Sequence, residues 1–356
     1  MPDFLLREAR ETDFKKIAEL HRLIWPEDQP VEEYICFYNW LLKKNPASGY
    51  SLVGVNGKGE ISAHCCLAGF YYSVNGRRRK GGFICQLMVR DDFRKSLLFA
   101  SLESRLLNQY PARKMDFAYG LIDGSAILKA HLAMGFKKAG KVPVYARPYK
   151  IFRILRKAAA GSRWKTAFVY MGYPFLKIAE QLLRVPCTRK NNLELIEVER
   201  FDENFDRLFQ QISRSFKISA LRTSDICNWR FFGLKERGYN VIGLKDKGNI
   251  LGYAVLRRMK MKTYNVLAVV DLFFLPGHRE AGKRLFYEIH RRSVQKKVDM
   301  AVCLLGPESY ISRMLGRAGF IKSPEFFTSV INTPGDIKDF TEPKDWHMTW
   351  FDHDYV

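Results

Sequence analysis

Few features of this sequence point to secretion or to a membrane span. The seven cysteines form no CxxC pair, and only Cys65 and Cys66 are adjacent. That spacing fits neither a disulfide framework nor a zinc site, so it predicts a reducing cytoplasm and no metal. The longest apolar run, "AFVYMGYPFL" at 167–176, is about half as long as a transmembrane helix. The first residues are charged and have no apolar signal-peptide centre, so we expect a cytoplasmic protein that is soluble or peripheral at the membrane.

Acidic residues are scarce in one segment. Residues 149–190 contain 10 Lys/Arg and 1 Asp/Glu, whereas residues 1–148 contain 23 and 15 and residues 191–356 contain 26 and 21. The basic segment is also rich in aromatic residues, and such a surface attracts phosphates, anionic lipid or an acidic protein. We expect a helical clasp whose apolar side chains pack between two flanking domains. The alternatives are an amphipathic segment that docks on an anionic membrane, and a track for RNA or an acyl-carrier protein, although no RNA-binding motif is present.

The chain repeats itself, and its 356 residues predict two domains. "GYSLVGVNGKGEI" at 49–61 and "GYNVIGLKDKGNI" at 238–250 share six identities at a constant offset of 189, and each predicts a β-hairpin with a Gly-containing turn. In both halves a strand, an amphipathic helix and a Trp-containing helix precede the hairpin. An apolar strand, a helix, a further strand and a helix that ends in Gly-Phe follow it, with Gly expected in the left-handed conformation. The sequence therefore predicts two copies of one α/β unit, at 1–148 and 191–356.

Glycine is missing from the turn in which such a unit would hold a phosphate. The stretch "VRDDFRKSLLFASL" at 89–102 lies between an apolar strand and a pattern with helical period. A helix N-terminus after a strand can receive an anion through its backbone N–H groups, but close approach of the backbone normally requires Gly. Here Lys95, Ser96, Leu97 and Leu98 occupy the turn.

The order of elements, the strand–turn–helix and the Gly-Phe ending resemble the GNAT superfamily of acyl-CoA-dependent N-acyltransferases, twice and over nearly the whole chain. Tandem members of that superfamily include bacterial acetyltransferases of unassigned substrate, N-myristoyltransferases and Fem-type aminoacyltransferases. The family's pyrophosphate turn has the form Val-x-Pro-x-Tyr-Arg-Gly-x-Gly-x-Gly/Ala. This chain matches it at Val89 and Arg94 and departs from it most seriously at Leu97, which stands where the family has Gly.

The resemblance implies two GNAT-like domains in an α/β fold with a mixed sheet, and acetyl-CoA as the acyl donor without a metal. It implies that the backbone of Leu87, Met88 and Val89 polarises the thioester carbonyl. The residues that would hold the pyrophosphate are Arg94, Lys95, Ser96, Leu97, Leu98 and Phe99. The amine acceptor, a small molecule or a peptide, would attack the thioester directly while a base removes its proton and an acid protonates the leaving thiolate.

The acid in this family is usually a Tyr four residues before the Gly of Gly-Phe. Counting back from Gly135 gives His131, which can carry a proton near pH 7, whereas counting back from Gly319 gives Leu315. Only the first half has a proton carrier at this position, so we expect a catalytic first half and a degenerate second half that completes the substrate groove. The alternative for His131 is a structural histidine packed on a helix face.

Two residues are candidates for the base, Asp116 and Asp123, which lie at the two ends of a predicted strand. An Asp at such a position is more often a solvent-exposed or capping residue than a base. The basic turn at 75–82 could receive the 3′-phosphate of CoA or an acidic substrate. The stretch "DWHMTWFDHDYV" at 345–356 predicts an ordinary polar C-terminus. Two other functions stay open. One is a non-catalytic GNAT-fold protein that binds a partner through its basic segment, and the other is a tRNA-dependent aminoacyltransferase.

Overall fold

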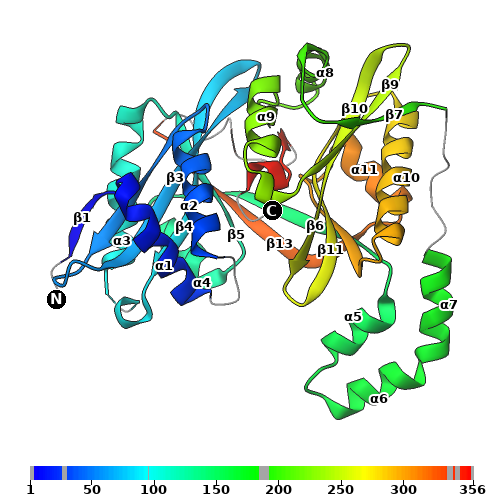
Figure 1. Cartoon of the computed structure of the whole chain (residues 1–356), viewed down its shortest axis with the longest axis horizontal. Helices are drawn as coiled ribbons and strands as arrows, with labels where there is room; N and C mark the ends of the chain where they lie inside the picture. The colour runs from blue at the N-terminus through cyan, green and yellow to red at the C-terminus, as the bar shows by residue number, and fades with distance from the viewer. Residues whose placement is uncertain are drawn as a thin grey trace.

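The computed structural model describes residues 4–25, 30–94, 96–183, 192–334, 340 and 345–353. Within these residues fourteen strands join in one mixed sheet, and helices pack on its faces (Figure 1). The predicted α/β class with a mixed sheet is confirmed.

Apart from two short strands of the second half, β8 (Ile218–Ala220) and β14 (Trp346–His347), the elements follow one another in the same order in the two halves of the chain. The first half comprises β1 (Leu5–Glu8), α1 (Phe14–Ile24), α2 (Val31–Tyr38) with a π-helical turn at Asn39–Lys43, β2 (Gly49–Val55), β3 (Ile61–Val74), β4 (Arg77–Val89), α3 (Leu98–Gln109), β5 (Phe117–Ile122), α4 (Ser125–Ala133) and β6 (Lys137–Pro148). The second half comprises β7 (Glu194–Val198), α8 (Glu203–Ser213), β8 (Ile218–Ala220), α9 (Ser224–Phe232), β9 (Asn240–Asp246), β10 (Asn249–Met261), β11 (Tyr264–Phe274), α10 (Arg279–Gln295), β12 (Met300–Leu304), α11 (Tyr310–Arg317), β13 (Ile321–Asn332) and β14 (Trp346–His347). Between them lie α5 (Ile151–Ala158), α6 (Arg163–Met171) and α7 (Tyr173–Leu183).

The repeated sequence motifs adopt matching structures. Strands β2 and β3 form one of the predicted hairpins and β9 and β10 the other, with Gly59 and Gly248 at φ 76° and 86° in the two turns. The helices before Gly135 and Gly319 also end alike, because both glycines have positive φ, at 90° and 83°. The predicted hairpins and left-handed helix ends are confirmed. Each of these glycines occupies a conformation that costs other residues free energy.

The two halves exchange their last long strands. Strand β13 of the second half lies between β5 and β6 and pairs antiparallel with both, from Thr328 opposite Ile122 to Asn332 opposite Ala118 on the β5 side. Strand β6 of the first half in turn pairs antiparallel with β12. Each half therefore completes the sheet of the other (Figure 1). The domain limits at 148 and 190 stay a prediction, since the hydrogen-bonded sheet continues across the middle of the molecule.

Apolar side chains pack against both faces of the first half's strands. Helices α1 and α2 cover one face, and α3 covers the other, where its buried leucines join a separate cluster with β2, β3 and β4. That smaller cluster includes Leu52, Leu67, Leu102, Leu106 and Phe136. The larger cluster runs from α1 and α2 across the middle of the molecule into the second half, so the halves share a core.

Two tryptophans at equivalent positions in the repeats join the halves. Trp40 and Trp229, 189 residues apart, are buried and stack with ring centroids 4.8 Å apart and an interplanar angle of 15°. The Nε1–H of Trp40 donates to the carbonyl of Trp229 at 2.8 Å, and the Nε1–H of Trp229 donates to the carbonyl of Trp40 at 3.0 Å. This reciprocal pair satisfies both buried indoles. The sequence-based interpretation of Trp229 as a core residue is confirmed.

The C-terminal stretch is not the ordinary polar terminus that its sequence predicts. Within residues 345–353, the side chains of Trp346, Met348, Trp350 and Phe351 are at most 2% exposed. Strand β14 pairs with β8, and β8 pairs with β3 of the first half. These pairings place the apolar side chains between the two halves. The alternation of large apolar and polar residues is the signal that this segment is core.

The basic segment is helical as predicted but does not pack between the halves. Helices α5, α6 and α7 form an arm that projects from the second half (Figure 1). The base of the arm is attached by Lys150 and Arg153, whose charged groups lie 3.5 and 3.2 Å from the buried carboxylate of Asp299. Because many apolar side chains of α6 and α7 are exposed, the expected clasp is not formed. Residues 184–190 of the predicted segment lie outside the described residues.

Removing one indole N–H of the tryptophan pair should destabilise the whole chain. We expect Trp40→Phe and Trp229→Phe each to lower the free energy of unfolding by about 1–3 kcal/mol, because each removes one of the two buried indole hydrogen bonds and leaves a gap beside the ring. The double variant should lose less than the sum, by about 0.5 kcal/mol or more. Denaturant unfolding of the four proteins measures this, with Trp164→Phe, at an exposed position, as the control. Strictly additive losses would show that the rings are not coupled.

Candidate functional site

Strands β4 and β5 pair over a short length and then separate. They are parallel and in register only from Gly81 opposite Phe117 to Phe83 opposite Tyr119. Gly81 permits this approach, since a Cβ there would lie 2.5 Å from the ring of Phe117. Beyond it, β4 continues to Val89 without a described strand on that side, while β5 pairs with β13 along its other edge. The edge of residues 84–89 that faces β5 therefore has no strand partner among the described residues, and we call this gap in the sheet's hydrogen bonding the opening.

A β-bulge lies in the unpaired part of β4. Across β3, His64 is opposite Met88 and Cys66 is opposite Cys85, so β4 has an extra residue there, and Gln86 has φ 52°. A left-handed Gln is costly by roughly 1 kcal/mol. Two side chains hold the bulge: His64 Nδ1–H donates to the Gln86 carbonyl at 2.9 Å, and the Tyr38 hydroxyl donates to Gln86 Oε1 at 3.3 Å. Bulges of this kind redirect a strand next to functional sites.

His64 is a buried histidine that stays neutral near pH 7. Burial lowers its pKa to about 4. The Gln86 carbonyl can only accept, so Nδ1 carries the hydrogen and Nε2 has a free lone pair. Nε2 makes no hydrogen bond to any described residue. The ring meets that of Tyr38 edge-on at 5.4 Å. Sequence reasoning missed His64 and Tyr38, although a lone His inside the apolar run "ISAHCCLAGF" is a visible signal.

The turn after β4 leads directly into the N-terminus of α3. The Leu97 side chain is 62% exposed and turns outward, whereas Leu98 is buried against Gly54. Ser96 Oγ caps the turn by donating to the Phe93 carbonyl at 2.6 Å and accepting from the Leu98 amide at 3.3 Å. Lys95 lies outside the described residues.

This turn has the groups that an anion needs, but carboxylates already pair with its arginines. The amides of Phe99 and Ala100 in the first turn of α3 make no hydrogen bond to a described residue, which is the usual donor set of a helix N-terminus. Arg94 pairs with Asp91 at 2.8 Å, and Arg90 pairs with Asp92 at 2.9 Å. Arg90 also pairs with Glu60 at 3.0 Å. The residues therefore fit a diphosphate group, with three exposed carboxylates as competitors for the arginines.

His131 lies behind this turn in a closed environment. Its side chain and that of Glu103 on α3 are each at most 1% exposed, and His131 Nδ1 hydrogen-bonds Glu103 Oε1. Burial raises the pKa of Glu103, although the bond to His131 opposes the rise. His131 Nε2 has no partner among the described residues, and the rings of Phe99 and Phe136 lie 6.1 and 5.2 Å from the imidazole. These neighbours enclose the imidazole, which is 1% exposed.

The two predicted bases lie at opposite ends of β5. Asp123 is exposed and follows β5 at the edge where the opening between β4 and β5 widens. Asp116 precedes β5, where its carboxylate accepts from the Lys80 amide at 2.8 Å and from Arg79 at 3.2 Å. Of the two, only Asp123 shares an edge of the sheet with Leu87–Val89 and Arg94–Phe99.

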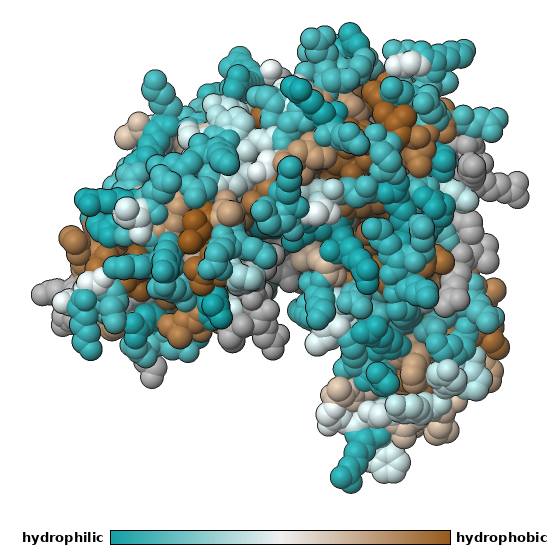
Figure 2. Space-filling model, viewed as in Figure 1, coloured by the Kyte–Doolittle hydropathy of each residue, from teal (hydrophilic) through white to brown (hydrophobic). Residues whose placement is uncertain are grey.

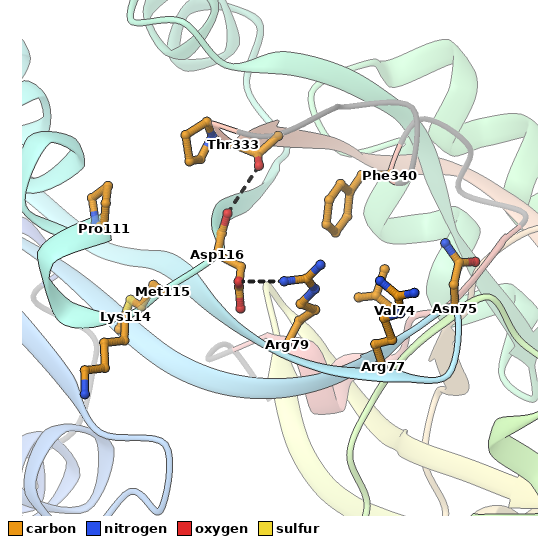
Figure 3. A pocket seen from close by; sticks show the side chains of 11 residues that line it. Val74, Asn75, Arg77, Arg79, Pro111, Lys114, Met115, Asp116, Thr333 and Phe340 are labelled. Atoms are coloured by element: carbon orange, nitrogen blue, oxygen red, sulfur yellow. Dashed lines mark hydrogen bonds and ion pairs between the residues drawn. The ribbon is translucent and has the colours of Figure 1, made fainter.

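Asp116 lines a separate basic cavity of about 710 Å³ (Figure 3). Arg77, Arg79 and Lys114 border it, and the Thr333 hydroxyl donates to the Asp116 carbonyl at 3.2 Å. The basic turn expected to meet CoA lies here, at the start of β4. At about 3.3 Å per residue the strand separates it from the 94–99 turn by roughly 40 Å. That distance argues against contact with the 3′-phosphate of a CoA bound at the 94–99 turn, and the role of the 75–82 turn stays a prediction.

Several solved structures share this architecture. The chain is similar to a probable N-acyltransferase from Enterococcus faecalis, with 11% identity, 93% of this chain and 73% of that chain covered and a TM-score of 0.63. It is similar to N-myristoyltransferase from Saccharomyces cerevisiae with bound myristoyl-CoA, with 13% identity, 98% and 91% coverage and a TM-score of 0.65. A GCN5-related N-acetyltransferase from Anabaena variabilis matches at 11% identity, 93% and 73% coverage and a TM-score of 0.64. No protein-family model and no curated protein matches the chain. The fold is that of the GNAT N-acyltransferases, as the sequence resemblance implied.

The neutral state of His64 predicts a specific loss of stability in acid. Its folded pKa lies below the ordinary value of 6.5, so the unfolded chain takes up the proton first as the pH falls. Stability is therefore lost between about pH 6.5 and pH 4, by up to about 3 kcal/mol from this residue. His64→Asn keeps a donor for the Gln86 carbonyl but does not titrate, so its unfolding free energy should fall less over this range. Urea unfolding at a series of pH values tests this, with exposed His278→Asn as control. Equal pH slopes for His64→Asn and wild type would contradict it.

Proposed function

We propose that the protein is an acyl-CoA-dependent N-acyltransferase whose first half is catalytic. The observation that supports this most strongly is the separation of β4 from β5, with a bulge at Gln86, directly before the N-terminus of α3. The same fold is found in N-myristoyltransferase solved with myristoyl-CoA. Identity to these structures is 11–13%, so the activity and its donor are inferences from the fold and from the residues at the opening.

The donor would lie along β4. The amides of Phe99 and Ala100, with Arg94, would hold the diphosphate at the start of α3. The backbone of Leu87, Met88 and Val89 would bind the acyl-bearing arm and polarise its carbonyl. Met88 is 1% exposed and fixes this part of β4 in the core, so the backbone is held in place before the substrate arrives. When bound, acyl-CoA supplies a thioester carbon that is reactive toward amines.

Proton transfer would use groups on the two faces of the sheet. The acceptor amine forms the new N–C bond as the C–S bond breaks, so one proton must leave nitrogen and one must reach sulfur. His64 lies on the α1–α2 face beside the bulge, and its free Nε2 is a candidate to accept the amine proton; exposed Asp123 at the same edge is a second candidate. His131, on the α3–α4 face, is the candidate to supply the thiolate proton. We propose an amine of a small molecule or a peptide as acceptor.

A non-catalytic GNAT-fold binding protein is the second candidate. Two features favour it: both arginines of the turn are already paired with carboxylates, and His131 is buried in a bond with Glu103. A protein of this kind would bind no acyl-CoA, which separates it from the first candidate.

Calorimetric titration with acetyl-CoA and myristoyl-CoA, and with CoA as reference, tests the donor. We expect micromolar binding that weakens at least tenfold in Arg94→Ala, because a charge-assisted contact to the diphosphate is lost. Asp91→Asn should tighten binding several-fold, since it frees Arg94 from its carboxylate partner. Arg79→Ala is the matched control and should leave the affinity unchanged, because Arg79 lies at the other end of β4. Absence of binding for both thioesters would favour the non-catalytic candidate.

Replacing His131 tests whether this residue is a proton donor in the reaction or a structural histidine of the core. His131→Asn keeps a side-chain donor for Glu103 but removes Nε2, so kcat should fall at least 100-fold if His131 protonates the thiolate. Lys129→Gln on the exposed side of α4 should have no effect. A variant with lower stability and wild-type kcat would assign the Glu103–His131 pair to the core.

A further inference from the structure

The arm carries an exposed apolar stripe. On α6 and α7, apolar residues recur every three or four positions and are between 57% and 81% exposed. They are Trp164, Phe168, Met171, Phe175, Ile178 and Leu182. This is the spacing of one helix face. Figure 2 shows apolar side chains, in tan and brown, on the surface of the arm. A face of this size is not left in water without a partner.

The charges around the stripe have one sign. Arg163 and Lys165 flank Trp164, and both are exposed. The single acidic residue of the described arm, Glu180, is 3% exposed, and it accepts from the Phe152 amide at 2.9 Å and from Lys177 at 2.8 Å. No carboxylate of residues 151–183 therefore faces solvent, and the outer surface of the arm is apolar and cationic.

The shape of the arm discriminates among partners. Helices α6 and α7 run in different directions and meet at Gly172, so the stripe bends (Figure 1). A straight partner helix, or the same helix of a second copy, would need a straight seam. Trp164, Phe175 and Met171 are more than 70% exposed, so they stand clear of the surface and a partner must surround them. A fluid lipid phase does this without matching pockets.

We propose that the arm docks on the surface of an anionic phospholipid bilayer. The apolar stripe enters the boundary between headgroups and acyl chains, a depth that favours Trp and Phe side chains. Arg163 and Lys165 contact the lipid phosphates. The stripe lies in the interface plane, since within the described residues every helix is too short or too polar to cross a membrane. This inference is independent of the acyl-CoA site, because no residue of the arm belongs to it.

Sedimentation with vesicles tests the docking. The full chain should bind vesicles of phosphatidylglycerol and phosphatidylcholine in equal parts more tightly than vesicles of phosphatidylcholine alone, and added salt should weaken the binding. Phe168→Ser combined with Phe175→Ser should weaken it at least tenfold. Arg163→Gln combined with Lys165→Gln should weaken it about fivefold for each charge removed. Circular dichroism confirms that the variants are folded.

Matched variants elsewhere on the surface complete the experiment. Leu5→Ser with Ile321→Ser removes two exposed apolar side chains from strands, and Lys15→Gln with Lys16→Gln removes two exposed cations from α1. Both should bind vesicles as wild type does. Failure of the wild type to bind the anionic vesicles, or unchanged binding of both arm variants, would overturn the proposal. Light scattering that shows a dimer in wild type and monomers in the phenylalanine variant would assign the stripe to a second copy of the chain instead.

Discussion

The exchange of the last long strands constrains everything else in this molecule. With β13 hydrogen-bonded to both β5 and β6, and β6 hydrogen-bonded to β12, the halves cannot separate without breaking three ladders in the middle of the sheet. Strand β5 is committed to β13 along its outer edge, and its short contact with β4 ends at Tyr119. The unpaired edge of β4 therefore follows from the pairing of the sheet itself.

A buried ion network occupies the space that the exchange encloses. Arg222 pairs with Asp271 at 2.8 Å, both fully buried, and Tyr253 donates to the same carboxylate at 2.8 Å. Burial alone would raise the pKa of Asp271, but Arg222 holds it below its ordinary value, so the pair remains ionised. Such a pair is tolerated only when its remaining groups are satisfied. The C-terminal segment does this through Thr349, which donates to Asp271 at 2.9 Å, and through Asp352, whose carboxylate lies 3.7 Å from Arg222. Asp352 also accepts from Tyr72 of the first half at 3.4 Å. One half thus supports the strands that form the opening in the other.

Local sequence patterns predicted the individual elements of this fold, but they could not predict the pairing of strands that lie far apart in the sequence. Short motifs, whose residues contact one another within a few positions, predicted three features. These are the hairpins, the helix ends at Gly135 and Gly319 and the turn into α3. The strand exchange pairs residues more than 150 positions apart, and no local pattern specifies which half β13 joins. The site shows the same division, since the turn after β4 was predicted while His64 was missed because its role depends on a bulge in a different strand. The exposed arm was misjudged because periodicity identifies an apolar face without saying what covers it.

The repeats also show why one half is the better candidate for chemistry. At the offset of 189 residues, Tyr38 corresponds to Cys227 and His64 to Tyr253. In the second half the Tyr253 hydroxyl donates to Asp271, and Arg222 donates to the same carboxylate. The residue at the position equivalent to His64 is thus part of a buried ion network. In the first half the His64 ring keeps a free nitrogen beside a strained backbone. A duplicated unit needs only one working opening, and the second copy is free to become the packed support. A buried nitrogen without a partner among the described residues and a left-handed Gln86 lie side by side in the first half, and such local costs often gather at functional sites.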